Sequence, residues 1–264
     1  PVLRLAIAGA FWGLALLTKI HAWLLPPLVL GYTMARLPWR KALAGSMIWG
    51  FVGFAVFLLG WPWLWNDSAD RLLRFLSTSV ERQPIRVLYF GQVVDDISLP
   101  WHYPWVYFAL TVPLGLHLLG LIGLVRGVRL RQSDPFPILL ACSIALFLIL
   151  FSTRAPVYDG ERLFLHVFPA WAMLVGLGFR TLWEASGSRI WLRGFLVALV
   201  VGQGAGVLRM HPYQLSYYNL LIGGLPGAER LGLELTYWGD TLSAPLLDEV
   251  ERRVPPGGSV AIAP

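Results

Sequence analysis

Seven runs of mostly apolar residues follow one another along this chain, and most approach the length of a membrane-crossing helix. About 20 apolar residues span the hydrocarbon core of a bilayer, with a tolerance of about 17–25. Only 14% of the 264 residues are charged, whereas a water-soluble domain carries about 25%. The sequence therefore predicts an all-α polytopic membrane protein with about seven transmembrane helices. The runs cover residues 3–18, 22–36, 43–61, 105–125, 136–151, 164–182 and 194–208.

The net charge of +6 follows from basic clusters between the apolar runs. A nucleic-acid site needs a basic stripe interleaved with stackable aromatic side chains, and no such stripe occurs. Lipid orientation explains the charge better, and we expect no nucleic-acid partner. Cys142 is the single cysteine, so the chain cannot form an internal disulfide.

Basic residues are dense in alternate loops, which predicts that these loops are cytoplasmic. Seven crossings then place the residues after 208 outside. We expect a transmembrane domain at 1–208, with an outer loop at about 62–104, and an extracytoplasmic segment at 209–264. That segment reads as the start of a small domain, for which a mixed α/β type is one option, with an amphipathic helix at 243–253 and a strand at 260–263. The basic loop residues are Arg4, Arg36, Arg40, Lys41, Arg126, Arg129, Arg131, Arg189 and Arg193.

Lys19 lies between the first two apolar runs. A lysine at a helix end often extends to the interface, which is the ordinary interpretation. Ionisable groups at membrane depth also face internal cavities and contact substrates or ions. An anionic lipid-linked substrate would be a suitable partner for Lys19.

A second polar cluster interrupts the apolar sequence before the sixth run. Tyr158, Asp159, Glu161 and Arg162 stand within five residues. The cluster is either a self-paired solvated loop or a site where Arg162 offers its planar guanidinium to a phosphate and the acids orient it. The sequence alone leaves both interpretations open.

The outer loop closes with Trp101, His102 and Tyr103. Aromatic side chains favour the membrane interface whatever the protein does. His102 can bind a phosphate or a sugar hydroxyl there, or serve as a hydrogen-bonded structural residue. Asp95 and Asp96 could together bind a divalent cation, but a solvated loop pair is the favoured interpretation. No cofactor is predicted with certainty, and no metal-ligand, nucleophile or nucleotide-binding motif occurs.

The order of these segments resembles the membrane-embedded GT-C glycosyltransferases, in the branch of protein O-mannosyltransferases and lipid A aminoarabinose transferases. The resemblance extends over most of the chain. The segments that carry it are GLALLTK at 13–19, WPW at 61–63, PWHY at 100–103, YDGER at 158–162, FP at 168–169, HP at 211–212, YYN at 217–219, GG at 223–224 and YWGD at 237–240.

The resemblance implies an enzyme that moves a sugar from a polyprenyl-phosphate donor to an acceptor at the outer face of a membrane, the bacterial inner membrane. It implies that Lys19 and Arg162 hold the carrier phosphate or shape its cavity, and that Trp101, His102 and Tyr103 form the mouth of the site. The family's catalytic carboxylate precedes the helix that opens this chain. Because the chain starts at Pro1 without Met, we expect a fragment that lacks this base and is inactive alone.

Two other classes fit parts of the pattern. Broken helices with intramembrane charge suit a transporter or flippase for lipid-linked sugars, although no repeated halves are visible. A non-enzymatic membrane scaffold with a partner-binding outer domain is the third class.

Overall fold

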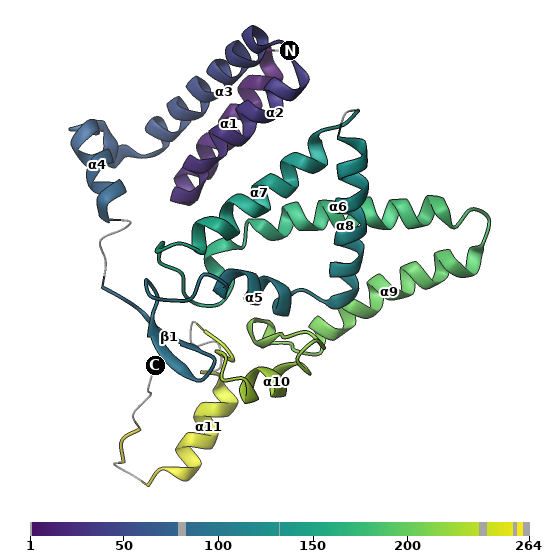
Figure 1. The fold of residues 1–264 in the computed structure, drawn as a ribbon. Helices are drawn as coiled ribbons and strands as arrows, with labels where there is room; N and C mark the ends of the chain where they lie inside the picture. The colour runs from purple at the N-terminus through teal and green to yellow at the C-terminus, as the bar shows by residue number, and fades with distance from the viewer. Residues whose placement is uncertain (1, 79–82, 132, 238–241, 256–257, 261–264) are drawn as a thin grey trace.

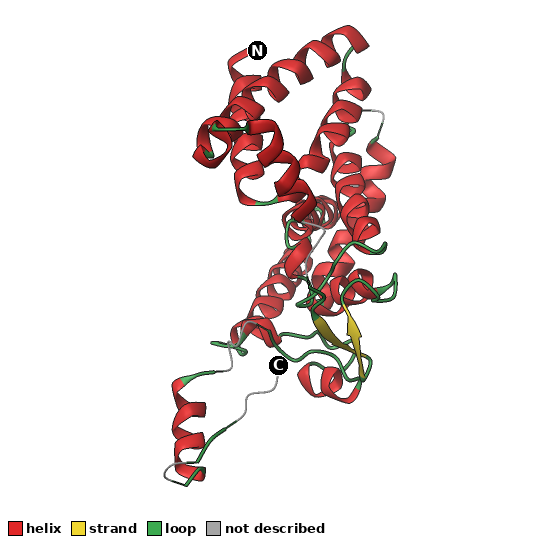
Figure 2. Cartoon of the chain, turned by 90° about the vertical axis from the view of Figure 1, so that its left-hand side faces the viewer, coloured by secondary structure: helices red, strands yellow, loops and turns green. Residues whose placement is uncertain are grey.

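The computed structural model describes residues 2–78, 83–131, 133–237, 242–255 and 258–260. These residues are mostly helical, as the sequence predicted, and they also contain one small hairpin that it did not predict (Figures 1 and 2). The helices are α1 (Val2–Thr18), α2 (Leu25–Arg36), α3 (Trp39–Gly60), α4 (Ser68–Thr78), α5 (Tyr103–Thr111), α6 (Leu114–Leu130), α7 (Phe136–Phe151), α8 (Val167–Ala185), α9 (Ile190–Leu208), α10 (Leu225–Arg230) and α11 (Ala244–Arg253). The 3-10 turns are η1 (Ile20–Leu24), η2 (Pro62–Trp65), η3 (Arg162–Phe164) and η4 (Gln214–Ser216).

The helices α1 and α3 lie side by side at one end of the molecule (Figure 1). Glycines allow this close approach: a Cβ atom on Gly9 or Gly13 would collide with the backbone of Trp49 or Gly53. Small residues at such contacts are typical of membrane helices. Apolar side chains gain little free energy by moving from lipid into a helix contact, so association depends on close packing of the backbones, which small residues allow. Trp12 stacks on Trp49 with ring centroids 4.4 Å apart and fills the core of this group.

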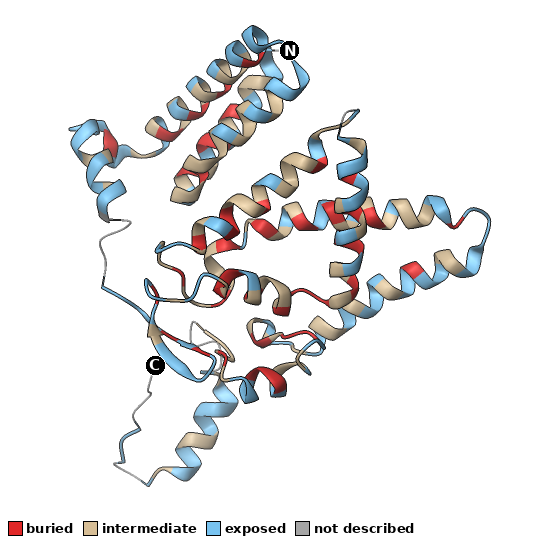
Figure 3. Cartoon of the chain, viewed as in Figure 1, coloured by how far each residue is buried: buried red, intermediate tan, exposed pale blue. Residues whose placement is uncertain are grey.

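A second group contains α5 to α9, and α6 packs most closely on α8. A Cβ atom on Gly123 would meet the Leu174 carbonyl, and one on Gly178 would meet the Leu119 carbonyl. Buried residues concentrate where these two helices cross, while α11 is largely exposed (Figure 3).

Gly178→Ala is expected to lower the thermal unfolding midpoint of the detergent-solubilised protein. The added methyl must push α6 and α8 apart, and overpacking of this kind costs about 1–3 kcal/mol. Gly176→Ala is the matched control, because it lies on the same helix and its Cβ would have no neighbour within 4 Å. Equal midpoints for the two variants would contradict the close packing.

The predicted span at 105–125 is wrong as a single helix. Here α5 and α6 meet at a bend of 112°. Pro113 lacks an amide hydrogen, and Val112 before it is extended, with ψ 133°. Asn219 satisfies the backbone at this break by donating its side-chain amide to the carbonyls of Ala109 and Val112, both at 2.7 Å.

Among the described residues, α3 and α9 are long and apolar enough to cross a membrane, and the bent α5–α6 pair would be a third span. The sequence predicted about seven. The difference arises because α1, α2 and α7 have 17, 12 and 16 residues, while α8 carries two charged residues near its end. Pro26 and Pro27 lie in the first turn of α2, where proline is tolerated, and therefore do not kink the helix.

Residues after α9 pack on the loop between α4 and α5. That loop contains an antiparallel hairpin of β1 (Arg86–Tyr89) and β2 (Gln92–Asp95). The amide of Gly91, in the hairpin turn, donates to the carbonyl of Gly232 at 2.9 Å. The amphipathic helix predicted at 243–253 is confirmed as α11. Most of the strand predicted at 260–263 lies outside the described residues.

Candidate functional site

Lys19 occupies the short interval between α1 and η1. Its amide still donates to Ala15 of α1, at 3.0 Å, but its own backbone is extended. The turn that follows folds back on α1, because the Trp12 indole donates to the carbonyl of Ala22 at 2.8 Å. These two hydrogen bonds fix the position of the Lys19 backbone at the end of α1.

The second cationic residue, Arg162, lies in the loop between α7 and α8. Asp159 and Gly160 both have positive φ, 55° and 58°, so the chain turns sharply here. Arg162 donates to Asp159 at 2.5 Å, and its guanidinium lies 5.5 Å from the centroid of the Tyr158 ring. The Gly160 amide donates to the Tyr103 hydroxyl at 3.0 Å, which anchors the turn to α5.

The structure brings these two distant segments together. Lys19 Nζ donates to the backbone carbonyl of Arg162 at 3.2 Å. Burial, and next the charge of Arg162, lower the pKa of Lys19. Asp159 balances Arg162, but Lys19 makes no ion pair with any carboxylate in the part of the chain that the structure describes. The site therefore retains positive charge in partly buried surroundings, which favours an anionic ligand.

A cavity of about 950 Å³ adjoins Lys19. Its walls come from the C-terminal ends of α1, α3 and α7, from α4, and from the loop before α8. Ligand sites of about 300–1,000 Å³ with mostly apolar walls and a few polar groups are typical of small-molecule and lipid pockets. The lining residues are Leu16, Leu17, Thr18, Lys19, Ile20, His21, Trp23, Leu24, Gly60, Trp61, Phe75, Leu150, Phe151, Ala155, Pro156, Tyr158 and Leu163.

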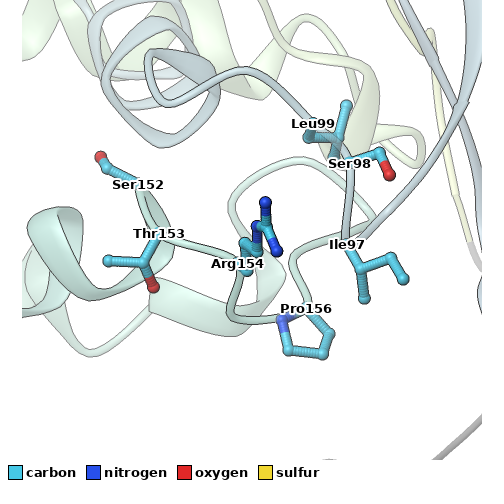
Figure 4. A pocket seen from close by; sticks show the side chains of 7 residues that line it. All are labelled: Ile97, Ser98, Leu99, Ser152, Thr153, Arg154 and Pro156. Carbon is cyan, nitrogen blue, oxygen red and sulfur yellow. The ribbon is translucent and has the colours of Figure 1, made fainter.

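A second cavity of about 790 Å³ lies on the other side of Pro156, which lines both. It is bounded by residues 97–99 and 152–156. Figure 4 shows the Arg154 side chain between these two segments.

Two glutamates lie in a tyrosine-rich cluster behind the Arg162 turn. The Tyr237 hydroxyl donates to Glu161 at 3.5 Å, and the Leu88 amide donates to Glu234 at 3.4 Å. The hydroxyl of Tyr218 donates to the Glu234 carbonyl at 2.5 Å. Burial raises the pKa of both glutamates to about 7. The cluster connects the Arg162 turn to the hairpin and to the C-terminal segment.

We expect the protein to become less stable as the pH rises from 5 to 8. The folded state holds protons on Glu161 and Glu234 up to about pH 7, whereas the unfolded chain releases them near pH 4.5. Between these values the folded state binds more protons, so its free energy of unfolding falls by at most about 1.4 kcal/mol per pH unit for each group. Thermal unfolding at several pH values measures this slope.

Glu161→Gln or Glu234→Gln should flatten that pH dependence. Glu229→Gln is the control, since Glu229 is exposed on α10. A slope that is unchanged in both cluster variants would remove these glutamates as its source.

The predicted site residues divide between two places. Lys19 and Tyr158 line the Lys19 cavity. Arg162 and Asp159 are not among its lining residues, but Arg162 adjoins it through its carbonyl contact with Lys19 and pairs with Asp159. Glu161 turns instead to Tyr237.

Trp101, His102 and Tyr103 do not line the Lys19 cavity. The His102 ring lies 2.8 Å from the Tyr89 hydroxyl on the hairpin, and the Tyr103 side chain is buried. Trp101 is 67% exposed. These positions fit the structural interpretation of His102, whereas Tyr103 touches the site through Gly160.

Sequence reasoning missed Phe75, His21 and Glu234. Phe75 reaches the cavity from α4 and packs edge-on against Trp61, with centroids 4.9 Å apart. One feature of the sequence could have identified His21 as a site residue: it lies two residues after Lys19. No local signal identified Glu234, because its burial depends on the distant hairpin.

The interpretation of Asp95 and Asp96 as a solvated pair is wrong for Asp96. Its side chain is 1% exposed and accepts a hydrogen bond from the Ile85 amide at 3.1 Å. Within the described ranges, no group of three or more His, Cys, Asp or Glu residues could hold a metal ion.

Comparisons with known proteins add no family assignment. No protein-family model matches the chain, and no curated protein or solved structure matches it. The geometry of the Lys19 cavity and the sequence resemblance are therefore what indicate a function.

Proposed function

We propose that this chain binds a polyprenyl-phosphate-linked sugar in the Lys19 cavity and serves transfer of that sugar to an acceptor at the outer face of the membrane. The observation that carries the proposal is the 3.2 Å contact between Lys19 Nζ and the Arg162 carbonyl beside a largely apolar cavity. A polyprenyl phosphate has the matching parts: an anionic head for the cations and a hydrocarbon chain for the walls.

The arrangement of helix ends supports a site on one side of the membrane. The sequence assigns Lys19 and Arg162 to the outer side, and they lie together. It assigns Arg36 and Asp134 to the cytoplasmic side, and these form an ion pair at 3.4 Å. We propose that the shorter helices α1, α2, α7 and α8 also lie in the bilayer, tilted or as partial spans, giving about seven segments with the C-terminus outside.

The Arg162 turn suits the chemistry of glycosyl transfer. When the sugar leaves, the phosphate of the carrier gains negative charge. Cations held in a poorly solvated cavity stabilise that charge more strongly than water-exposed cations would. The ion pair with Asp159 and the ring of Tyr158 orient the guanidinium of Arg162 before substrate arrives.

The proposal is tested by comparing first the affinities of several lipids and then the sugar-transfer activities of variants. In nanodiscs, the protein should bind a long-chain polyprenyl monophosphate more tightly than the polyprenol of equal length or inorganic phosphate. In membranes containing the full-length protein, labelled sugar should move from polyprenyl phosphate to an acceptor, and Lys19→Ala and Arg162→Ala should reduce this transfer.

Other outcomes identify the competing functions. Movement of the labelled lipid across vesicles without sugar transfer would assign a transporter. A protein that binds polyprenyl phosphate no better than polyprenol, and that transfers no sugar, would fit the scaffold and refute the proposal.

A further inference from the structure

Two histidines from distant parts of the chain meet beside the cavity. His21 belongs to η1 and lines the cavity, and His166 precedes α8. Their ring centroids are 5.6 Å apart. His21 also packs edge-on against Phe151 at 5.2 Å, and His166 against Phe147 at 3.8 Å. Aromatic packing therefore holds the His21 ring in one place.

Both imidazoles carry a buried nitrogen without a hydrogen-bond partner among the described residues. These atoms are His21 Nδ1 and His166 Nε2. Buried polar atoms are nearly always paired, because an unpaired one costs about 1–3 kcal/mol. Because these two nitrogens are shielded, a ligand in the cavity would meet the accessible part of the His21 ring, which is half-buried and lines the cavity.

The charge state of His21 suits a site already occupied by cations. Burial, and next the charge of Lys19, lower the pKa of His21 to about 4. The ring is therefore neutral at physiological pH and carries one N–H donor. A neutral donor can bind a phosphate oxygen without adding a third positive charge beside Lys19 and Arg162.

We propose that His21 is a third binding residue for the donor phosphate, donating a hydrogen bond from its ring N–H while Lys19 and Arg162 supply the charge. This inference rests on the proposed function. His166 lies outside the set of residues that line the cavity. Its part is to pack against the His21 ring.

Binding titrations in nanodiscs separate ligand contact from packing. His21→Leu keeps most of the side-chain volume and removes the donor, so the Kd for a long-chain polyprenyl monophosphate should rise about 10-fold or more, as for loss of a hydrogen bond to a charged group. Binding of the matching polyprenol should stay unchanged. His21→Gln retains an N–H donor and should restore part of the affinity.

His166→Leu is the matched control. It alters the neighbouring ring without removing a group that lines the cavity, so its Kd for the monophosphate should change less than that of His21→Leu. Equal losses in the two variants, or an equal loss for polyprenol, would show that packing is responsible and would overturn the inference. If His21→Leu does not fold, the same comparison is made with His21→Met, which also lacks a donor.

The failure of this inference differs from failure of the proposed function. Wild-type protein that binds monophosphate better than polyprenol, together with a His21→Leu variant of equal affinity, refutes only the role of His21; an ordered water then satisfies the ring. Wild-type protein that does not distinguish the two lipids refutes both.

Discussion

Replacing Lys19 with alanine is expected to weaken binding of a long-chain polyprenyl monophosphate about 100-fold, as for loss of one charge-assisted contact in poorly solvated surroundings. Lys19 makes no ion pair with a carboxylate among the described residues, so its charge is available to an anion. Binding of the polyprenol should not change, because the hydrocarbon walls remain. Titration of both lipids into nanodisc-embedded protein measures the difference.

Lys41→Ala is the matched control for that experiment. Lys41 is an exposed lysine in the first turn of α3, far along the helix from the end that meets the cavity. It should leave both affinities unchanged. An equal loss for Lys19→Ala and Lys41→Ala would indicate that general surface charge attracts the lipid, and the site would be rejected.

The second large effect is expected for Asn219→Ala, which should lower the free energy of unfolding by about 3 kcal/mol. The Asn219 side chain is 1% exposed, and its amide holds the carbonyls of Ala109 and Val112. Alanine removes both hydrogen bonds where α5 bends into α6: the Val112 carbonyl loses its Asn219 partner, while the Ala109 carbonyl keeps only the contact with His117 Nε2 at 3.2 Å. Thermal or denaturant unfolding in detergent measures the loss.

Gln214→Ala serves as the control for Asn219. Gln214 is an exposed amide in η4, a few residues earlier, and its side chain hydrogen-bonds the neighbouring His211 at 2.9 Å. Its stability should match that of the wild type. If Asn219→Ala also matched the wild type, the α5–α6 break would need another source of stability.

Local sequence signals predicted much of the helical structure. The apolar run at 136–151 became α7 with the same bounds, and the runs near 3–18 and 194–208 became α1 and α9 with small shifts. Such runs are informative because hydrophobicity and helix formation depend mainly on residues within a few turns.

Other features were predicted incompletely because two local signals competed. The run at 105–125 is apolar throughout, yet Pro113 divides it. The aromatic residues at 101–103 suggested the mouth of a site, but Tyr89 of the β1–β2 hairpin, which has no apolar run of its own, engages His102. The length of an apolar run indicates that the segment is buried in lipid or protein, but it does not indicate where the backbone turns.

The sequence by itself determined the apolar helices and the placement of a few cations at helix ends, since both follow from the order of neighbouring residues. Only the tertiary structure decided that Lys19 meets Arg162, 143 residues later, and that His21 lies beside His166. The physical reason is that contacts between distant segments depend on how helices pack, and glycines such as Gly178 permit that packing only when the partner helix is in place.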